Sequence, residues 1–304
     1  MLKLPSGVQV IERGWLSANM VITTGRHNTA VVDSGYCTHA AQTVDLVRSA
    51  MNDADLDLLL NTHLHSDHCG GNFALQAEYR NLQTLIPPGH APFVTDWNPD
   101  VLTHTPTGQQ CPRFHHESLL VPGTEILIGD HVWQIHAATG HDPHSVILFE
   151  EESRTLISAD ALWENGFGVV FPELEGQSAF AAVAETLDLI QQLKPLTVIP
   201  GHGRVFAYSD EVLQRARQRL AAFEQNPTKH ARHGAKVLLK FKLLEVQKQS
   251  YSKFKTWAFA TSYLGLVRSQ FFSDTSHDDW IDQLINELIN SGVAKRDGET
   301  IINI

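Results

Sequence analysis

The sequence predicts an α+β protein in which two β-sheets lie between helices, followed by a smaller, mainly helical domain. Residues 1–208 alternate short runs of β-branched residues with turn residues, and only two segments there have clear helical spacing. From Ser209 onward, long helical stretches dominate. Many strands with interspersed helices favour two packed sheets over one doubly wound parallel sheet. We therefore expect two domains, residues 1–208 and residues 209–304.

Ten short apolar segments of the first domain are predicted to be strands, because each is rich in β-branched or other apolar residues and ends at turn residues. They are residues 8–11, 20–23, 29–33, 56–61, 84–86, 125–128, 132–136, 146–149, 155–158 and 197–199. Residues 40–51 and 180–193 instead have their apolar side chains at helical spacing, and Pro195 ends the second of these helices.

The second domain is predicted to be helical with a terminal hairpin. Residues 210–223, the stretch through Leu244 and residues 280–289 have helical patterns. Asp297-Gly298 lies between two short strand-like runs, which is a strong short-range signal for a β-hairpin. A helix followed by a terminal hairpin resembles a winged-helix module, so we expect a winged-helix-like domain.

Charge is distributed unevenly between the two domains. Residues 1–208 contain 9 Lys and Arg against 23 Asp and Glu, whereas residues 209–304 contain 14 against 11. Between Lys229 and Lys255, eight basic residues accompany a single acid, Glu245. A solvated basic helix face is the first interpretation, and a contact surface for nucleic acid or a second subunit is the alternative. The acidic first domain argues against broad non-specific binding of nucleic acid.

The cysteines and the apolar runs indicate in which cellular compartment the protein is expected. Cys37, Cys69 and Cys111 are odd in number and form no C-x-x-C pair, so neither a disulfide framework nor a structural zinc ribbon is expected. No apolar run approaches the roughly 20 residues that span a bilayer. The N-terminus lacks the long apolar segment of a secretory signal. We therefore expect a cytoplasmic protein without a membrane partner.

Four candidate metal ligands follow the predicted strand at residues 56–61. They form an H-x-H-x-D-H pattern and are His63, His65, Asp67 and His68. The first two are two residues apart, which places both on one side of an extended chain. A turn after them could bring the other two to the opposite side of a shared cavity, where Gly70-Gly71 permits close backbone approach. Four ligands within six residues suit two adjacent ions.

With this motif the chain resembles the metallo-β-lactamase superfamily, whose signature is a T-H-x-H-x-D-H-x-G-G stretch at a strand end. Three later residues fit the family pattern in order, each close to the end of a predicted strand: His141, Asp160 and His202. Asp33-Ser34-Gly35 matches a structural turn of the family. The resemblance covers roughly residues 8–208. It implies an αββα sandwich with metals at one edge of the sheets.

The resemblance implies a site for two metal ions. One ion would be held by His63, His65 and His141, the second by Asp67, His68 and His202, with Asp160 bridging them. Imidazole and carboxylate ligands without thiolate suit Zn²⁺, with Fe or Mn as alternatives. Cys69 adjoins this cluster, and packing against the sheet is its expected role.

Such a site implies a hydrolase. Two cations that share a water lower its pKa, direct the hydroxide at an electrophile and polarise the oxygen on which charge develops. Asp67 would orient this hydroxide, and His144 is a candidate proton shuttle. The di-iron oxygen reductases of the superfamily resemble H-x-E at the position where this chain has His65, so redox chemistry is disfavoured. One class of β-lactamases has Cys at the position of Asp160, so hydrolysis of antibiotics is disfavoured as well. The favoured substrates are therefore esters, thioesters or lactones.

Alternatives to this function remain open. A phosphodiesterase or nuclease of the same superfamily could hold nucleic acid with its basic C-terminal domain, and a regulatory protein could retain the metal site without turnover. Acyl-homoserine lactonases have Tyr at the position of Trp163, so the hydroxyl of that family is missing here. The C-terminal region shows no glutathione-binding pattern like that of glyoxalase II, which weighs against a glutathione thioester as the substrate. The C-terminal domain could equally shape the mouth of the site or mediate a homodimer.

Two segments could contact a small acyl substrate. Residues 163–172, with Phe167, Val169, Val170 and Phe171, are expected to pack in the core or at an interface, and the alternative is an apolar wall that faces the substrate. The Pro-rich connection at residues 87–118 is long enough to form a lid.

Overall fold

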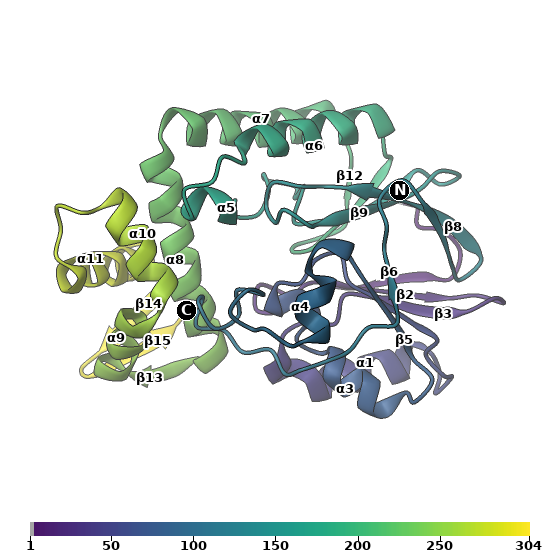
Figure 1. Cartoon of the computed structure of the whole chain (residues 1–304), viewed down its shortest axis with the longest axis horizontal. Coiled ribbons are helices and arrows are strands. Elements are labelled where there is room, and N and C mark those ends of the chain that lie inside the picture. Colours follow the sequence, from purple (N-terminus) through teal and green to yellow (C-terminus); the bar gives the residue numbers. More distant parts are fainter. Residues whose placement is uncertain (1–2) are drawn as a thin grey trace.

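Two six-stranded sheets form the centre of the protein in the computed structural model, which describes residues 3–304 (Figure 1). The first sheet contains β1 (Val8–Ile11), β2 (Met20–Thr24), β3 (Thr29–Val32), β4 (Leu58–Leu60), β5 (Gln83–Ile86) and β6 (Ser118–Leu119), side by side in that order. The second contains β7 (Glu125–Ile128), β8 (His131–Ala137), β9 (Val146–Glu150), β10 (Thr155–Ala159), β11 (Thr197–Pro200) and β12 (Phe206–Ala207), also in chain order.

Side chains that alternate along the strands explain the layers. Val21 packs between the two sheets, whereas its neighbour Ile22 packs under α1 (Ala40–Ala50) and α3 (Asn72–Glu78). In the second sheet, Leu148 faces the first sheet, whereas Phe149 packs with α6 (Phe180–Leu193) and α7 (Asp210–Gln225). A strand whose residues are apolar on both faces must be buried on both. The predicted αββα sandwich is thereby confirmed.

The remaining helices of the sandwich are short. They are η1 (Cys37–His39), α2 (Ser66–Cys69), η2 (Pro88–His90), α4 (Ala91–Thr95) and α5 (Phe171–Leu174).

The C-terminal part is mainly helical, as predicted. It consists of α8 (Pro227–Val246), β13 (Lys248–Ser250), α9 (Tyr251–Ala260), α10 (Ser262–Phe271), α11 (His277–Asn290), β14 (Ala294–Asp297) and β15 (Thr300–Asn303). The predicted hairpin is present, but pairing of Asp297 with Thr300 makes Gly298-Glu299 its turn, one residue later than expected. Gly298 has a φ of 56°, which glycine adopts without strain. With β13, the hairpin forms a three-stranded sheet.

Helix α8 connects the two parts (Figure 1). Helix α7, which begins at Asp210, belongs to the same core cluster as α6, so the helical layer of the sandwich continues beyond residue 208. The division at residues 208 and 209 stays a prediction, and its first two residues, Met1 and Leu2, lie outside the described range. Across residues 3–304, no helix is both long and apolar enough to cross a membrane.

Candidate metal centre

All seven predicted ligands gather where the strands of the two sheets end. His63 and His65 follow β4, and α2 presents Asp67 and His68 directly after them. His141 follows β8, whereas Asp160 and His202 follow the parallel strands β10 and β11. Because β9 runs antiparallel to both β8 and β10, the carboxyl ends of β8, β10 and β11 meet at one edge. Val146 donates its N–H to the carbonyl of Thr62 at 2.9 Å, which joins the two sheets there.

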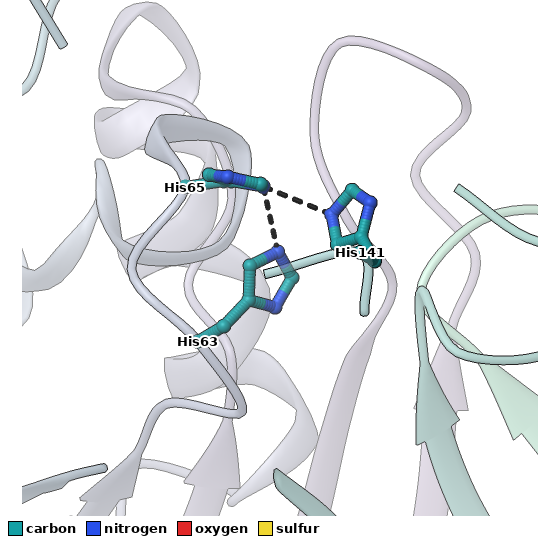
Figure 2. A group of neighbouring side chains, drawn as sticks. All are labelled: His63, His65 and His141. Carbon is teal, nitrogen blue, oxygen red and sulfur yellow. Dashed lines mark hydrogen bonds between the residues drawn. The ribbon is translucent and has the colours of Figure 1, made fainter. Parts of the chain in front are cut away.

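Three histidines form the first group. His65 Nδ1 lies 3.0 Å from His63 Nε2 and 2.9 Å from His141 Nε2. Figure 2 shows the three rings converging from two different loops. Their nitrogens lie within 4.8 Å of one another, which is close enough for one ion to contact all three.

Asp67, His68 and His202 form the second group, in which the ligand atoms also lie within 4.8 Å of one another. His202 Nε2 lies 3.1 Å from Asp67 Oδ2. Asp160 stands between the two groups, because its Oδ2 is 3.4 Å from His141 Nε2 and its Oδ1 is 3.6 Å from His68 Nε2. This is the arrangement expected of a bridging carboxylate.

Hydrogen bonds on the outer side fix how the imidazoles face the centre. His68 Nδ1 donates to Asp33 Oδ2 at 2.7 Å, His141 Nδ1 donates to the Val169 carbonyl, and His202 Nδ1 donates to the Gly14 carbonyl. In each ring the Nε2 lone pair is therefore left for a metal. His65 is turned the other way, because its Nε2 lies 3.7 Å from Asp142 Oδ2 and its Nδ1 faces the centre.

Burial controls the protonation of the first group. Burial and the surrounding histidines lower the pKa of His63 well below its ordinary value. Burial and the neighbouring His141 lower the pKa of His65 to about 3, although Asp142 opposes the shift. Both rings are consequently neutral near pH 7, as metal coordination requires.

The second group is held by opposite charges. Burial disfavours the charged form of Asp160, but the neighbouring His202 and His68 bring its pKa well below the ordinary value. Burial likewise disfavours protonation of His68, but Asp33 and Asp160 raise its pKa well above 6.5. Buried carboxylates of this kind need positive charge beside them.

The residues fit a metal centre on two observations. His68 Nε2 is buried and has no hydrogen-bond partner, so this atom lacks the contact that a buried polar group needs. Gly201 allows the backbone to approach, because a Cβ at that position would lie 2.2 Å from Asp160 Oδ1. The donors are imidazole and carboxylate groups throughout, which suits Zn²⁺, Fe or Mn.

A bulge at the end of β10 directs Asp160 into the site. The register with β11 shifts between Ile157 and Ala159, and Ala159 has a φ of 46°. Its carbonyl accepts the N–H of Gly201 at 2.7 Å, so the bulge is tied to the loop that carries His202. Left-handed backbone at a residue other than glycine costs about 1–3 kcal/mol and is typical of functional sites.

A cavity of about 380 Å³ opens beside the metal centre. Its walls include Trp15, which stacks on His202, and Trp163, which packs edge to face against both of these rings. Val237 and Phe241 of α8 form another part of the wall. The fold divides residues 163–172 between the two predicted roles: Trp163, Val169 and Phe171 line the cavity, whereas Phe167 and Val170 belong to the core. Thr103, Thr107 and Gln109 of the long connection also line it, and whether that segment moves as a lid stays a prediction.

His144 lies away from the seven ligands. Its ring packs against His90 at a centroid distance of 4.3 Å, and it lines a second cavity on the far side of His65. The main-chain N–H of His144 donates to Oδ1 of Asp142 at 2.7 Å, and the other oxygen of this carboxylate lies 3.7 Å from His65 Nε2. The role of His144 as a proton shuttle stays a prediction. Cys69 is buried in an apolar cluster with Ile86 of β5, and its Sγ lies 3.7 Å from Cys111 Sγ.

Sequence reasoning missed three residues that shape the site. Trp15 comes from the loop before β2 and stacks on His202, and nothing in its local sequence indicates this contact. Asp142 follows His141 directly, so an acid beside a ligand could have suggested its orienting role. Arg219 lies on α7 and reaches the cavity only through the fold.

Comparison with known proteins identifies the family. A sequence model described as "Metallo-beta-lactamase superfamily" matches residues 13–202, more than half of the chain. "Hydroxyacylglutathione hydrolase" of Idiomarina loihiensis is 24% identical over 184 residues, which cover 60% of this chain and 57% of that protein. "Beta-lactamase-like protein 2 homolog" of Drosophila melanogaster is 26% identical over 189 residues, covering 58% of each. The matches thus span little more than half the length of these relatives.

Solved structures share the fold. A metallo-beta-lactamase family protein from Thermus thermophilus superposes with a TM-score of 0.59 at 16% identity, over 99% of this chain and 100% of that one. A beta-lactamase domain protein from Burkholderia ambifaria gives a TM-score of 0.58 at 18% identity, over 100% and 94%. The family match, the αββα sandwich and the gathered His and Asp side chains agree: the chain belongs to the metallo-β-lactamase superfamily.

Proposed function

We propose that the protein is a metal-dependent hydrolase that cleaves a carboxylic ester, thioester or lactone at a centre of two metal ions. The observation that carries the proposal is the position of Asp160, with one oxygen toward His141 of the first group and the other toward His68 of the second. Two groups of three donors joined by one carboxylate are suited to two adjacent ions. Zinc is the proposed metal, with Fe or Mn as alternatives, because imidazole and carboxylate donors without thiolate suit all three.

The side chains around the bound substrate have different roles in the proposed reaction. Metal ions, when bound, supply activation of water and polarisation of the carbonyl. Asp67 lines the cavity, where its carboxylate can accept a proton from an incoming water. Trp163 donates its Nε1–H to Asp160 Oδ1 at 3.2 Å and so holds this carboxylate in place. Aromatic and aliphatic walls exclude bulk water from the scissile carbonyl, which strengthens every charge interaction there.

A small acyl substrate is favoured for two reasons. The relative from Idiomarina is named a hydrolase of hydroxyacylglutathione, which is a thioester. The cavity volume of about 380 Å³ lies in the usual range of small-molecule sites.

The charges of α8 and its surroundings weigh against the nuclease alternative. Arg232 and Lys236 both pair with Glu287, and Lys242 pairs with Glu245. Lys255 pairs with Asp278 and Asp282. Much of the basic stretch is thus neutralised within the chain, and less of its charge is left for a phosphate backbone.

The decisive experiment compares matched thioester, ester, lactone and phosphodiester substrates with zinc-loaded protein. We expect turnover of carbonyl substrates that disappears on chelation and in His63→Ala, with the circular dichroism spectrum unchanged. His131→Ala, which alters an exposed hydrogen bond to the Ser6 carbonyl, serves as the control and should keep full activity. Cleavage of the phosphodiester alone would contradict the proposal.

A further inference from the structure

A partly buried arginine lines the active-site cavity without an acidic partner. Arg219 of α7 lines the same cavity as Asp67 and Asp160. Among residues 3–304, no carboxylate oxygen lies within 4.0 Å of its guanidinium. Burial without a compensating negative charge lowers the pKa of Arg219. An arginine is always charged near neutral pH, so this position maintains an uncompensated cation beside the proposed reaction centre.

The guanidinium is held in a defined orientation. It stacks over Phe223 at 5.1 Å and over Phe167 at 5.6 Å from the ring centroids. Its Nη2 donates to His233 Nε2 at 3.0 Å, while its Nε is buried with no hydrogen-bond partner. A Cβ at Gly166 would lie 2.7 Å from Arg219 Cδ, so glycine there leaves room for the side chain. Side chains fixed in this way lose little entropy when they bind a ligand.

The other residues that line the cavity indicate which chemical groups the ligand contains besides an anion. Apolar surface of the cavity comes from Phe171 and from three residues of α8, Val237, Leu238 and Phe241. The other charged residues that line the cavity outside the metal ligands, Glu164 and Arg204, are exposed at its rim. The lining therefore suits a ligand with an apolar body and one anionic group that reaches Arg219.

We propose that Arg219 binds a carboxylate on the substrate, so that the protein acts on small acyl compounds with an apolar body and a carboxylate remote from the scissile carbonyl. This inference rests on the proposed hydrolase function. Guanidinium and carboxylate match in geometry and form charge-assisted hydrogen bonds, which are about twice as strong as neutral ones. Binding would satisfy the unpaired cation and place the carbonyl at the metal centre.

Matched substrates test the assignment by turnover. The pair is a thioester of a phenylalkanoic acid that carries a terminal carboxylate, and the same thioester with a carboxamide in its place. In Arg219→Met, we expect kcat/KM for the carboxylate substrate to fall about 10- to 100-fold, the range for loss of a charged hydrogen bond, with the carboxamide changed less than about 3-fold. Arg217→Met is the control, because this arginine of the same helix is engaged by Asp188 and Gln191. Equal losses on both substrates would overturn the proposal.

A binding measurement separates this inference from the proposed function. Calorimetry on the metal-free protein compares 3-phenylpropionate with 3-phenylpropionamide. We expect the acid to bind about 10-fold more tightly or better, and this preference to vanish in Arg219→Met but not in Arg217→Met. If neither thioester is hydrolysed but the preference persists, the hydrolase proposal fails and the anion site stands. No preference for the acid in the wild-type protein would contradict the anion site whatever the enzyme hydrolyses.

Discussion

At the scale of single residues, the metal centre depends on side chains that never touch the proposed ions. Asp33 accepts three hydrogen bonds, from the Thr62 N–H, the Thr62 hydroxyl and His68 Nδ1. One carboxylate thus fixes both the loop that carries His63 and the ring of His68. Partners of this kind orient metal ligands and raise their basicity.

Asp33→Asn tests this support. Asn also tolerates the φ of 60° found at residue 33, but it lacks the charge and one acceptor oxygen. We expect zinc affinity, measured by competition with a chromophoric chelator, to fall about 10- to 100-fold, as for other outer partners of metal ligands. Asp45→Asn on the exposed face of α1 should leave the affinity unchanged. Equal affinity in the wild-type protein and Asp33→Asn would show that Asp33 serves only the fold.

Four of the seven gathered residues were predicted from a local motif, and the resemblance to the superfamily supplied His141, Asp160 and His202. The sequence could not predict Arg219 or Trp15, since neither stands near a ligand in the chain. Phe167 and Phe171 illustrate a similar limit. Both are apolar and four residues apart, but only the turn between Asp160 and α5 decides that Phe171 faces the cavity and Phe167 faces the core.

At the scale of elements, strands with a strong apolar pattern were found to within about two residues, and those without one were missed. Lys248–Ser250 became a strand only because it pairs with β15, and its polar residues give no strand pattern. The two-residue strands β6 and β12 are equally dependent on their neighbours. Strand propensity reflects packing against partners, which a segment alone does not reveal.

The bulge at the end of β10 makes a prediction for the element that carries Asp160. Ala159→Val places a β-branched residue at a φ of 46°, where such side chains clash with the backbone. We expect the free energy of unfolding of the metal-free protein to fall by about 2 kcal/mol and zinc binding to weaken. Ala159→Gly suits this backbone and should change the unfolding free energy by less than about 1 kcal/mol. A Val variant as stable as the Gly variant would show that the bulge stores no strain.

At the scale of the whole molecule, the cavity is built jointly by the sandwich and the C-terminal helices. Glu245 near the end of α8 accepts hydrogen bonds from the Tyr36 hydroxyl and from Gln110 Nε2. Tyr263 donates its N–H to the Pro106 carbonyl, so α10 holds the long connection that lines the cavity. The predicted role of the C-terminal part in shaping the mouth of the site agrees with these contacts. A dimer remains a prediction.

The start of α8 makes the stability of the whole protein depend on pH. His230 is buried among Phe180 of α6 and Phe223 of α7, and its Nε2 accepts the Val170 N–H at 3.1 Å. Burial, with like charge on His233 and Arg219, lowers the pKa of His230 to about 3. In the unfolded chain the pKa of this histidine is about 6.5, so between about pH 3 and pH 6.5 the unfolded chain binds a proton that the folded protein does not bind.

Stability contributed by neutral His230 is thus fully present above about pH 6.5 and is lost progressively as the pH falls toward about 3. Between pH 7.5 and 5, this single group should lower the free energy of unfolding by about 2 kcal/mol. Urea denaturation of metal-free protein, compared between the wild type and His230→Gln, isolates the effect, because Gln keeps an acceptor but does not titrate. We expect the difference in unfolding free energy between the wild type and His230→Gln to change by about 2 kcal/mol between pH 7.5 and pH 5. Parallel curves would show that the junction between α8 and the sandwich accommodates a protonated histidine, and that acid weakens the protein elsewhere.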